Sequence, residues 1–356
     1  MTKYGTYYHV PTQLFKFFLV MWLSWLVAFG GAGMTDQVHY NDFFQSLNRN
    51  SFSGENVFWK LLFGSFINDR RENYEVGYVL INLLAKQLGI SYLAFMFSIS
   101  IITHTLLINF IYKHRYPVFT VLIYIASTFY VQQANLVRQM IAMTIFLYSF
   151  RYIERGLFLP YLGGILIAVA FHMSAVLLFV VYFLPSKVPK SWLLWGIWLF
   201  SIYISLKGLD LPVVKIGYYS LQKFNRAVEE SGPNLFFNGM LVALLASNPN
   251  KLATRRYVLA FNMFFIGVIL LNLSSITFYF YRLSYYFSIF SIVVIPLIPL
   301  TLTNRLKYIF PPKIVYAMSN FLLVAFYVNI LVRRVITNPE GVIGYRLHDF
   351  MELFNQ

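Results

Sequence analysis

Residues 257–302 read YVLAFNMFFIGVILLNLSSITFYFYRLSYYFSIFSIVVIPLIPLTL, and this long stretch carries a single charged side chain, that of Arg282. A helix that crosses a bilayer needs roughly 20 mainly apolar residues. The stretch is long enough for two such helices, Tyr257–Tyr279 and Leu283–Leu302, with Arg282 between them. It therefore predicts a pair of membrane spans joined near Arg282.

The composition extends this prediction to the rest of the chain. Of the 356 residues, 59% are hydrophobic and 12% are charged, whereas soluble domains carry about a quarter charged residues. Because similar apolar stretches recur, we predict an all-α polytopic integral membrane protein with about 9–11 membrane segments. The other candidate spans are Phe15–Gly33, Ser91–Tyr112, Pro117–Gln133, Gln139–Ile153, Trp192–Leu206, Leu235–Ala246 and Ile314–Val332.

Cysteine is absent, which excludes a disulfide framework, a thiol nucleophile and a Cys-ligated metal. The formal net charge is +15, which in a soluble protein would suggest a nucleic-acid partner. Here the lysines and arginines lie in short loops between apolar runs, as the positive-inside rule describes for membrane proteins. We therefore predict no nucleic-acid partner.

The basic loops orient the chain in the membrane. If all of them are cytoplasmic, the spans between them must come in pairs. The apolar stretch Leu157–Leu184 must then enter and leave on the same side, as two short helices bent near His172. A single long span is the alternative for that stretch. The basic clusters lie at residues 113–115, 151–155, 187–190, 251–256 and 305–313.

This orientation predicts one polytopic domain over residues 1–356, with two sizeable segments outside. The first covers residues 34–90 and combines an outer loop with an amphipathic surface helix, Glu75–Ile90. The second outer loop covers residues 207–234. Since the cytoplasmic loops are short, we expect the chemistry on the outer side. The apolar stripe of the surface helix consists of Val79, Leu80, Leu83 and Leu84.

Ionisable side chains at membrane depth are costly and are usually paired or functional. Three of them converge on the outer side in this topology, namely Arg138, His172 and Arg282. Each also has a purely structural interpretation. Arg138 would reach lipid phosphates, His172 would pack against a carbonyl, and Arg282 would anchor a belt of aromatic residues.

The outer segments add two carboxylates. Asp36 lies one helical turn before Tyr40, and Glu75 opens the surface helix, where a negative charge also suits the helix dipole. The residues around Asp36 do not complete a metal site, so we predict no metal. The sequence also lacks a P-loop, a Gly-x-Ser-x-Gly elbow and a His-Glu-x-x-His zinc helix.

Five short motifs follow one another along the chain. They are Asp-x-x-x-Tyr-x-x-x-Phe (Asp36, Tyr40, Phe44), Glu-x-Gly-Tyr (Glu75, Gly77, Tyr78), Asn-x-x-Arg-Gln-x-x-Ala (Asn135, Arg138, Gln139, Ala142), Phe-His-x-Ser-Ala (Phe171, His172, Ser174, Ala175) and Tyr-Arg-x-x-x-Tyr (Tyr281, Arg282, Tyr286). Each motif alone is weak. In this order, across most of the chain, they resemble the EpsG-like branch of the Wzy polysaccharide polymerases, which build O-antigens and exopolysaccharides.

The resemblance implies a metal-independent, cofactor-free, membrane-embedded glycosyltransferase of GT-C-like architecture. Its donor and acceptor would both be undecaprenyl-diphosphate-linked oligosaccharides. Arg138 and Arg282 would hold the diphosphate, because a guanidinium binds phosphate bidentately. His172 would be the general base, since imidazole exchanges protons near neutral pH. Asp36 or Glu75 would share that role or orient the sugars. The expected substrate-binding residues are Tyr40, Tyr78, Gln139, Tyr281 and Tyr286.

The resemblance also implies a location and partners. The protein would be a multi-pass protein of the bacterial inner membrane with its active site facing the periplasm, among membrane lipids and beside a flippase and a chain-length regulator. Three other functions stay open at this point. They are ligase-type transfer of a finished glycan, transport of a lipid-linked sugar by a flippase with inverted repeats, and acyl transfer with His172 as base.

Overall fold

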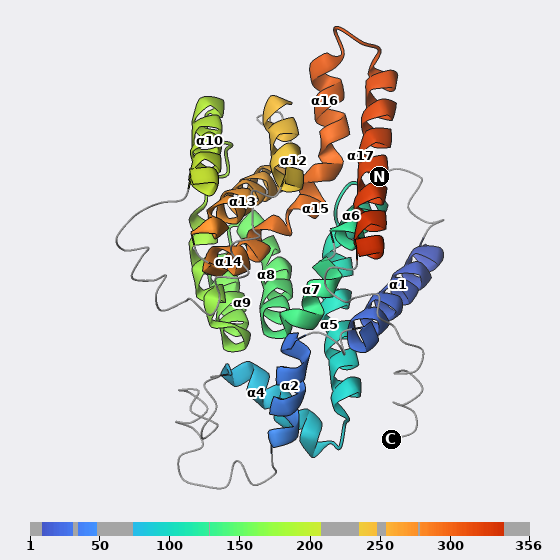
Figure 1. Cartoon of the computed structure of the whole chain (residues 1–356), viewed down its shortest axis with the longest axis vertical. Coiled ribbons are helices and arrows are strands. Elements are labelled where there is room, and N and C mark those ends of the chain that lie inside the picture. Colours follow the sequence, from blue (N-terminus) through green and yellow to red (C-terminus); the bar gives the residue numbers. More distant parts are fainter. Residues whose placement is uncertain are drawn as a thin grey trace. The chain divides into compact units, whose positions relative to one another are not determined.

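The computed structural model describes residues 9–30, 35–47, 74–127, 129–207, 235–247, 254–276 and 278–337. Within these residues the chain is helical and contains no strand (Figure 1). The prediction of an all-α protein is confirmed. The helices are α1 (His9–Gly30), α2 (Thr35–Ser46), α4 (Val76–Gln87), α5 (Tyr92–Ile111), α6 (Pro117–Ala126), α7 (Phe129–Asn135), α8 (Val137–Arg155), α9 (Phe158–Phe171), η3 (Met173–Phe183), α10 (Ser191–Lys207), α12 (Leu235–Ala246), α13 (Arg255–Asn272), η6 (Leu273–Ser275), α14 (Phe278–Ser288), α15 (Ser291–Val294), η7 (Ile295–Leu297), α16 (Ile298–Leu306) and α17 (Pro312–Thr337).

Several described helices are suited to a bilayer. Four stretches are long and apolar enough to cross it, namely Thr12–Phe29, Tyr92–Ile111, Arg255–Asn272 and Tyr279–Leu306. Shorter apolar helices accompany them, and together they make this a multi-pass membrane protein. The shorter ones are Pro117–Ala126, Phe158–Phe171, Met173–Phe183, Ser191–Leu206 and Leu235–Ala246.

One predicted span is interrupted. We expected a continuous helix over Pro117–Gln133, but α6 ends at Ala126 and α7 begins only at Phe129. The sequence between them begins with Ser127, and hydroxyl side chains compete with the helix for backbone hydrogen bonds. The prediction of one unbroken span is therefore wrong.

The chain divides into two compact units. Unit 1 consists of Met1–Pro117, Tyr124–Tyr182 and Asn329–Gln356, and unit 2 of Val118–Ile123 and Phe183–Val328. The single domain predicted over residues 1–356 stays a prediction. The predicted outer loop 207–234 lies almost entirely outside the described residues, as does the middle part of the segment 34–90.

In unit 1, α1 packs against α5, and α8 packs against both α5 and α9 (Figure 1). A buried histidine ties the broken helix to this group. His104 of α5 lies within hydrogen-bond distance of Ser100 through Nδ1 and of the Tyr124 hydroxyl through Nε2, at 2.9 Å and 3.2 Å. Gln133 of α7 donates to Thr103. Polar side chains of apolar helices thus find partners on neighbouring helices, as membrane packing favours.

Basic residues gather at one end of unit 1. The rings of Phe110 and Phe150 are in contact and bring the ends of α5 and α8 together. Basic residues stand close to both phenylalanines in the sequence. Lys16 of α1 joins them, because its ammonium lies 4.5 Å from the centre of the Tyr112 ring. We call this the basic end. Its cations are Lys16, Lys113, Arg115, Arg151 and Arg155.

The stretch Leu157–Leu184 forms the predicted pair of short helices. α9 ends at Phe171, His172 has extended backbone (φ −157°, ψ 114°), and η3 follows as a 3-10 helix. The two arms fold back on each other, since the Tyr161 hydroxyl donates to the Leu178 carbonyl and the Phe158 and Tyr182 rings lie 5.0 Å apart. The bend predicted near His172 is confirmed.

A period of three residues explains why the second arm is a 3-10 helix. Ala175, Leu178 and Val181 are all buried, with exposed apolar residues between them. Three residues complete one turn of a 3-10 helix, so these side chains lie on one line and pack together against α9. In an α-helix the same three would drift around the axis.

In unit 2 the helices α10, α12 and α13 share a buried amide network. Asn238 donates to Asn272 at 2.8 Å, Asn272 donates to Ser201 at 2.9 Å, and Trp198 donates to Asn238 at 2.7 Å. Arg282 belongs to this unit and lies inside α14, whereas we expected it between two spans. The chain breaks earlier, at the 3-10 turn η6, so that prediction was wrong.

Candidate active site

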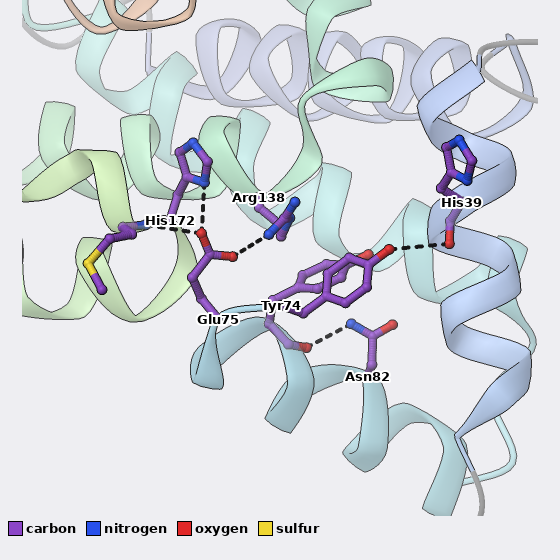
Figure 2. Close-up of polar contacts among 8 residues, drawn as sticks. His39, Tyr74, Glu75, Asn82, Arg138 and His172 are labelled. Atoms are coloured by element: carbon purple, nitrogen blue, oxygen red, sulfur yellow. Dashed lines mark hydrogen bonds and ion pairs between the residues drawn. The ribbon is translucent and has the colours of Figure 1, made fainter. Parts of the chain in front are cut away.

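Three charged or ionisable residues of unit 1 meet at the tip of the α9–η3 hairpin. The Glu75 carboxylate lies between the other two (Figure 2). Its Oε1 is 3.0 Å from His172 Nδ1 and its Oε2 is 2.5 Å from Arg138 Nη1. The backbone N–H of Met173 also donates to Oε1, at 3.1 Å. We call Glu75, Arg138 and His172 the triad.

Each member is held at the end of a helix. Glu75 directly precedes α4, Arg138 is the second residue of α8, and His172 is the first residue after α9. The triad thus forms where the ends of three helices meet. Its side chains are 15–18% exposed, and this leaves an approach for a substrate.

Gly77 allows α4 to approach α9 closely enough for this contact. A Cβ atom at Gly77 would lie 2.7 Å from the carbonyl oxygen of Ala170 and 3.1 Å from its carbonyl carbon. Real Cβ atoms do not come this close to backbone. Because Ala170 stands two residues before His172, the missing side chain is what sets the distance from Glu75 to His172.

Gly77→Ala should therefore reduce turnover strongly. The added methyl group must push α4 away from α9, and a displacement of about 1 Å at a reacting group costs roughly 10²-fold in rate. Gly163→Ala in α9 is the matched control, because no atom lies within 4 Å of its added Cβ. Turnover per purified molecule is the measurement, and a Gly77→Ala protein as active as the Gly163→Ala protein would refute this role.

Glu75 is an ionised carboxylate in this site. Burial by itself would raise its pKa, but four other effects outweigh burial. They are the hydrogen bond from His172, the charge of Arg138, the charge that His172 carries when it is protonated, and the Met173 N–H. Together they lower the pKa of Glu75 from 4.5 to about 2. A carboxylate this acidic is a weak base, so Glu75 is suited to orienting its neighbours.

The ionised Glu75 also fixes the proton on His172. A carboxylate only accepts hydrogen bonds, so the His172 nitrogen that faces it must carry the proton. That nitrogen is Nδ1, at 3.0 Å. In the neutral ring Nε2 then keeps its lone pair, and among the described residues no side chain binds it. His172 is thus arranged as a proton acceptor through Nε2.

Aromatic rings hold the guanidinium of Arg138. Its centre lies 4.7 Å from the Tyr74 ring and 5.9 Å from the Tyr40 ring. The Tyr74 ring is stacked in turn on Phe43, with 4.0 Å between ring centres. Cation–π contacts in a desolvated place are favourable, so the rings restrict Arg138 to one orientation.

The structure also places the other predicted site residues. Tyr40 and Tyr78 lie in the aromatic cluster under the triad, with their rings 5.5 Å apart. Gln139 is buried in α8, next to Arg138. Asp36 lies in the first turn of α2. Among the described residues, Glu75 is the acidic partner of both Arg138 and His172.

Three predicted residues belong to unit 2. Tyr281, Arg282 and Tyr286 lie together on α14, and Arg282 and Tyr286 are one turn apart, as predicted. The Tyr285 hydroxyl donates to that of Tyr281 at 2.6 Å. Tyr286 is fully buried. Their part in a common site with the triad stays a prediction.

Sequence reasoning missed Tyr74. It stacks on Arg138, and its hydroxyl donates to the His39 carbonyl at 3.5 Å (Figure 2). Its position directly before Glu75 was a usable signal. The described residues contain no group of three acidic or histidine side chains that could hold a metal ion.

The chain matches the model of a known protein family. The model of the EpsG family matches residues 13–346, which include all three triad residues. No curated protein and no solved structure matches the chain.

Proposed function

The chain belongs to the EpsG family, and from this we propose that it is a polysaccharide polymerase that joins undecaprenyl-diphosphate-linked oligosaccharide repeat units by glycosyl transfer. The observation that carries the proposal is the Glu75–His172 contact, which leaves one imidazole nitrogen ready to accept a proton beside a partly exposed arginine. Proton acceptor and cation are the two groups that this reaction needs.

In the proposed reaction a hydroxyl oxygen of the acceptor sugar attacks the anomeric carbon of the donor sugar. The bond from that carbon to the lipid diphosphate breaks, and the diphosphate leaves with the electron pair. His172 Nε2 takes the hydroxyl proton as general base. Glu75 holds the ring in the required tautomer and stabilises the imidazolium that forms, as the carboxylate of a catalytic triad does.

Arg138 is the proposed partner of the leaving diphosphate. Negative charge grows on phosphate oxygens as the bond breaks, and a preorganised guanidinium stabilises that charge. The Tyr74 ring fixes its orientation, while 18% of its side chain is exposed. A phosphate would then share or replace the contact with Glu75. Arg282 is a second proposed cation for the same diphosphate, and Asp36 and the tyrosines are proposed to contact sugars.

The proposed site faces the outside of the inner membrane. Arg138 and Arg155 lie near opposite ends of α8, about 26 Å apart along the axis. Arg155 belongs to the basic end, which the positive-inside rule assigns to the cytoplasm. The triad at the other end of α8 would then face the periplasm, where finished lipid-linked repeat units would be joined.

Single cysteines test this orientation, because the native sequence has none. A cysteine at exposed Gln87, at the triad end, should react with a membrane-impermeant maleimide in intact spheroplasts. A cysteine at partly exposed Glu154, at the basic end, should react only after permeabilisation. The reverse pattern would place the triad in the cytoplasm and contradict the proposal.

The function is tested with purified protein in lipid vesicles and the lipid-linked repeat unit extracted from cells that lack this protein. A polymerase produces a ladder of lipid-linked products that differ by one repeat. A ligase-type enzyme gives a single transfer to another acceptor, and a flippase moves the substrate without making a new bond. Absence of any ladder from folded protein would reject the polymerase.

A further inference from the structure

Under the triad lies a group of buried polar atoms without partners. Within the described residues, no hydrogen bond of normal geometry reaches the Gln37 side-chain nitrogen, the Tyr78 hydroxyl or the Asn82 side-chain oxygen. Gln37 is 4% exposed, and Tyr78 and Asn82 are 0% exposed. A buried polar group without a partner loses its hydration and gains nothing in return. Native proteins contain few such groups, so three in one place require an explanation.

These atoms belong to one location. The Tyr92 hydroxyl lies 3.2 Å from the side-chain oxygen of Gln37. Burial raises the pKa of Tyr78 well above 10.0, and the hydroxyls of Tyr92 and Tyr40 raise it further. The Asn82 side-chain amide donates to the Tyr78 carbonyl at 2.7 Å, which places it beside Tyr78. Gln37 lies one turn before Tyr40 on α2, and the Tyr40 ring contacts that of Tyr78 at 5.5 Å. Gln37, Tyr78 and Asn82 are therefore gathered around one point.

That point is connected to the triad. Tyr78 stands three residues after Glu75, one turn further along α4. Its ring contacts that of Tyr40 at 5.5 Å, and Tyr40 lies below the Arg138 guanidinium at 5.9 Å. The Nε atom of Arg138 is also buried without a partner. The polar atoms therefore continue from the triad into the aromatic cluster.

The chemistry of these groups suits one class of ligand. An amide N–H, a phenol and an amide oxygen provide donors and acceptors without a formal charge. Aromatic rings of Tyr40, Tyr74 and Tyr78 surround them. A metal ion would require more oxygen or nitrogen ligands, and a phosphate would require cations. A sugar offers hydroxyl groups that both donate and accept, together with apolar C–H faces that pack on rings.

We propose that Gln37, Tyr78 and Asn82 form a binding subsite for a neutral sugar ring of the lipid-linked repeat unit. This inference rests on the proposed function. The sugar hydroxyls satisfy the three unpartnered groups and thereby hold the ring beside His172. In the structure the rings of Tyr40 and Tyr74 pack against that of Tyr78 at 5.5 Å and 5.8 Å, so the sugar replaces part of this packing when it binds.

Two nearly isosteric variants test the subsite, Tyr78→Phe and Gln37→Met. Each removes one polar group and keeps the packing. We expect KM for the extracted lipid-linked repeat unit to rise about 3- to 10-fold, the range of one lost neutral hydrogen bond. The melting temperature should stay the same or rise, because a buried group without a protein partner is removed. Inhibition by inorganic pyrophosphate should stay unchanged, since Arg138 is intact.

The exposed Tyr203→Phe in α10 is the matched control and should change none of these values. An unchanged KM in Tyr78→Phe and Gln37→Met would overturn the proposal. So would a lower melting temperature with reduced turnover at saturating substrate, because that pattern indicates a structural hydrogen bond.

A separate measurement keeps the subsite testable if the wild-type protein makes no ladder. The free oligosaccharide, released from the lipid by mild acid, should raise the melting temperature of the wild-type protein and raise that of Tyr78→Phe less. If the oligosaccharide does not shift the wild-type protein, the subsite is rejected independently of the polymerase reaction.

Discussion

His172→Ala should lower glycosyl transfer by about 10²- to 10⁴-fold, the usual contribution of one acid–base group. His172→Gln should not restore the rate, because an amide can form hydrogen bonds but cannot accept the proton. Both proteins should still insert into the membrane, since His172 lies at the tip of the hairpin and is partly exposed. The rate must be measured per molecule of purified protein, which separates lost chemistry from lost protein.

His39→Gln is the matched control for this prediction. His39 is exposed on α2, and its backbone carbonyl accepts a hydrogen bond from Tyr74. The substitution should leave the rate near that of the wild-type protein. If His172→Gln turns over as fast as His39→Gln, His172 is a packing residue and the base must be sought elsewhere.

Glu75→Gln should lose about as much activity as His172→Ala, although it changes one atom. The amide donates where the carboxylate accepted, so it binds the other tautomer of His172, with the proton on Nε2. A base in the wrong tautomer typically loses on the order of 10⁴ in rate. The variant also leaves the charge of Arg138 without its partner, and breaking a buried ion pair costs about 3–5 kcal/mol when burial is complete. The partial exposure here reduces that cost.

Two readouts separate these effects of Glu75→Gln. The melting temperature reports the lost ion pair, and the rate at saturating substrate reports the tautomer. Glu75→Asp keeps the charge but withdraws the carboxylate by one methylene, so it should keep more stability than activity. Wild-type turnover by Glu75→Gln would remove the carboxylate from the mechanism.

The pKa of Glu75 also predicts a pH dependence. Because this pKa is lowered from 4.5 to about 2, the stability that the ionised carboxylate contributes is complete above pH 4.5 and is lost as the pH falls toward 2. Between pH 5 and 8 Glu75 does not titrate. Any loss of transfer on acidification in that range must come from another group.

Much of the fold could be predicted from the sequence, because lipid offers no hydrogen bonds to the polar backbone groups and a helix satisfies them within one segment. The bend at His172 followed from two observations. The basic loops before and after Leu157–Leu184 had to lie on the same side of the membrane, and His172 interrupts this apolar stretch. The interruption after Ala126 was missed, since its residues remain apolar enough to read as a continuous span. The prediction that Arg282 lies between two spans was wrong for a related reason. The pattern of apolar residues did not reveal the earlier turn at η6.

The meeting of the triad could not be read from sequence spacing. Glu75 is 63 positions from Arg138 and 97 from His172, and only the packing of α4 on α9 joins them. The motifs singled out the right residues one by one, but their ion pairs depend on Gly77 and on the rings beside Arg138. Gln37 and Asn82 carried no signal at all, because a buried amide becomes noticeable only when its partners can be counted.

The 3-10 helix η3 has a further consequence, which concerns length. Its 11 residues rise about 2.0 Å each and span roughly 22 Å, while the 14 residues of α9 rise about 1.5 Å each and span roughly 21 Å. Two arms with unequal numbers of residues thus reach equally far. If η3 were an α-helix, it would be about 5 Å too short. His172 would then be drawn toward the open end of the hairpin and away from Glu75. The unusual winding therefore sets the height at which His172 meets Glu75.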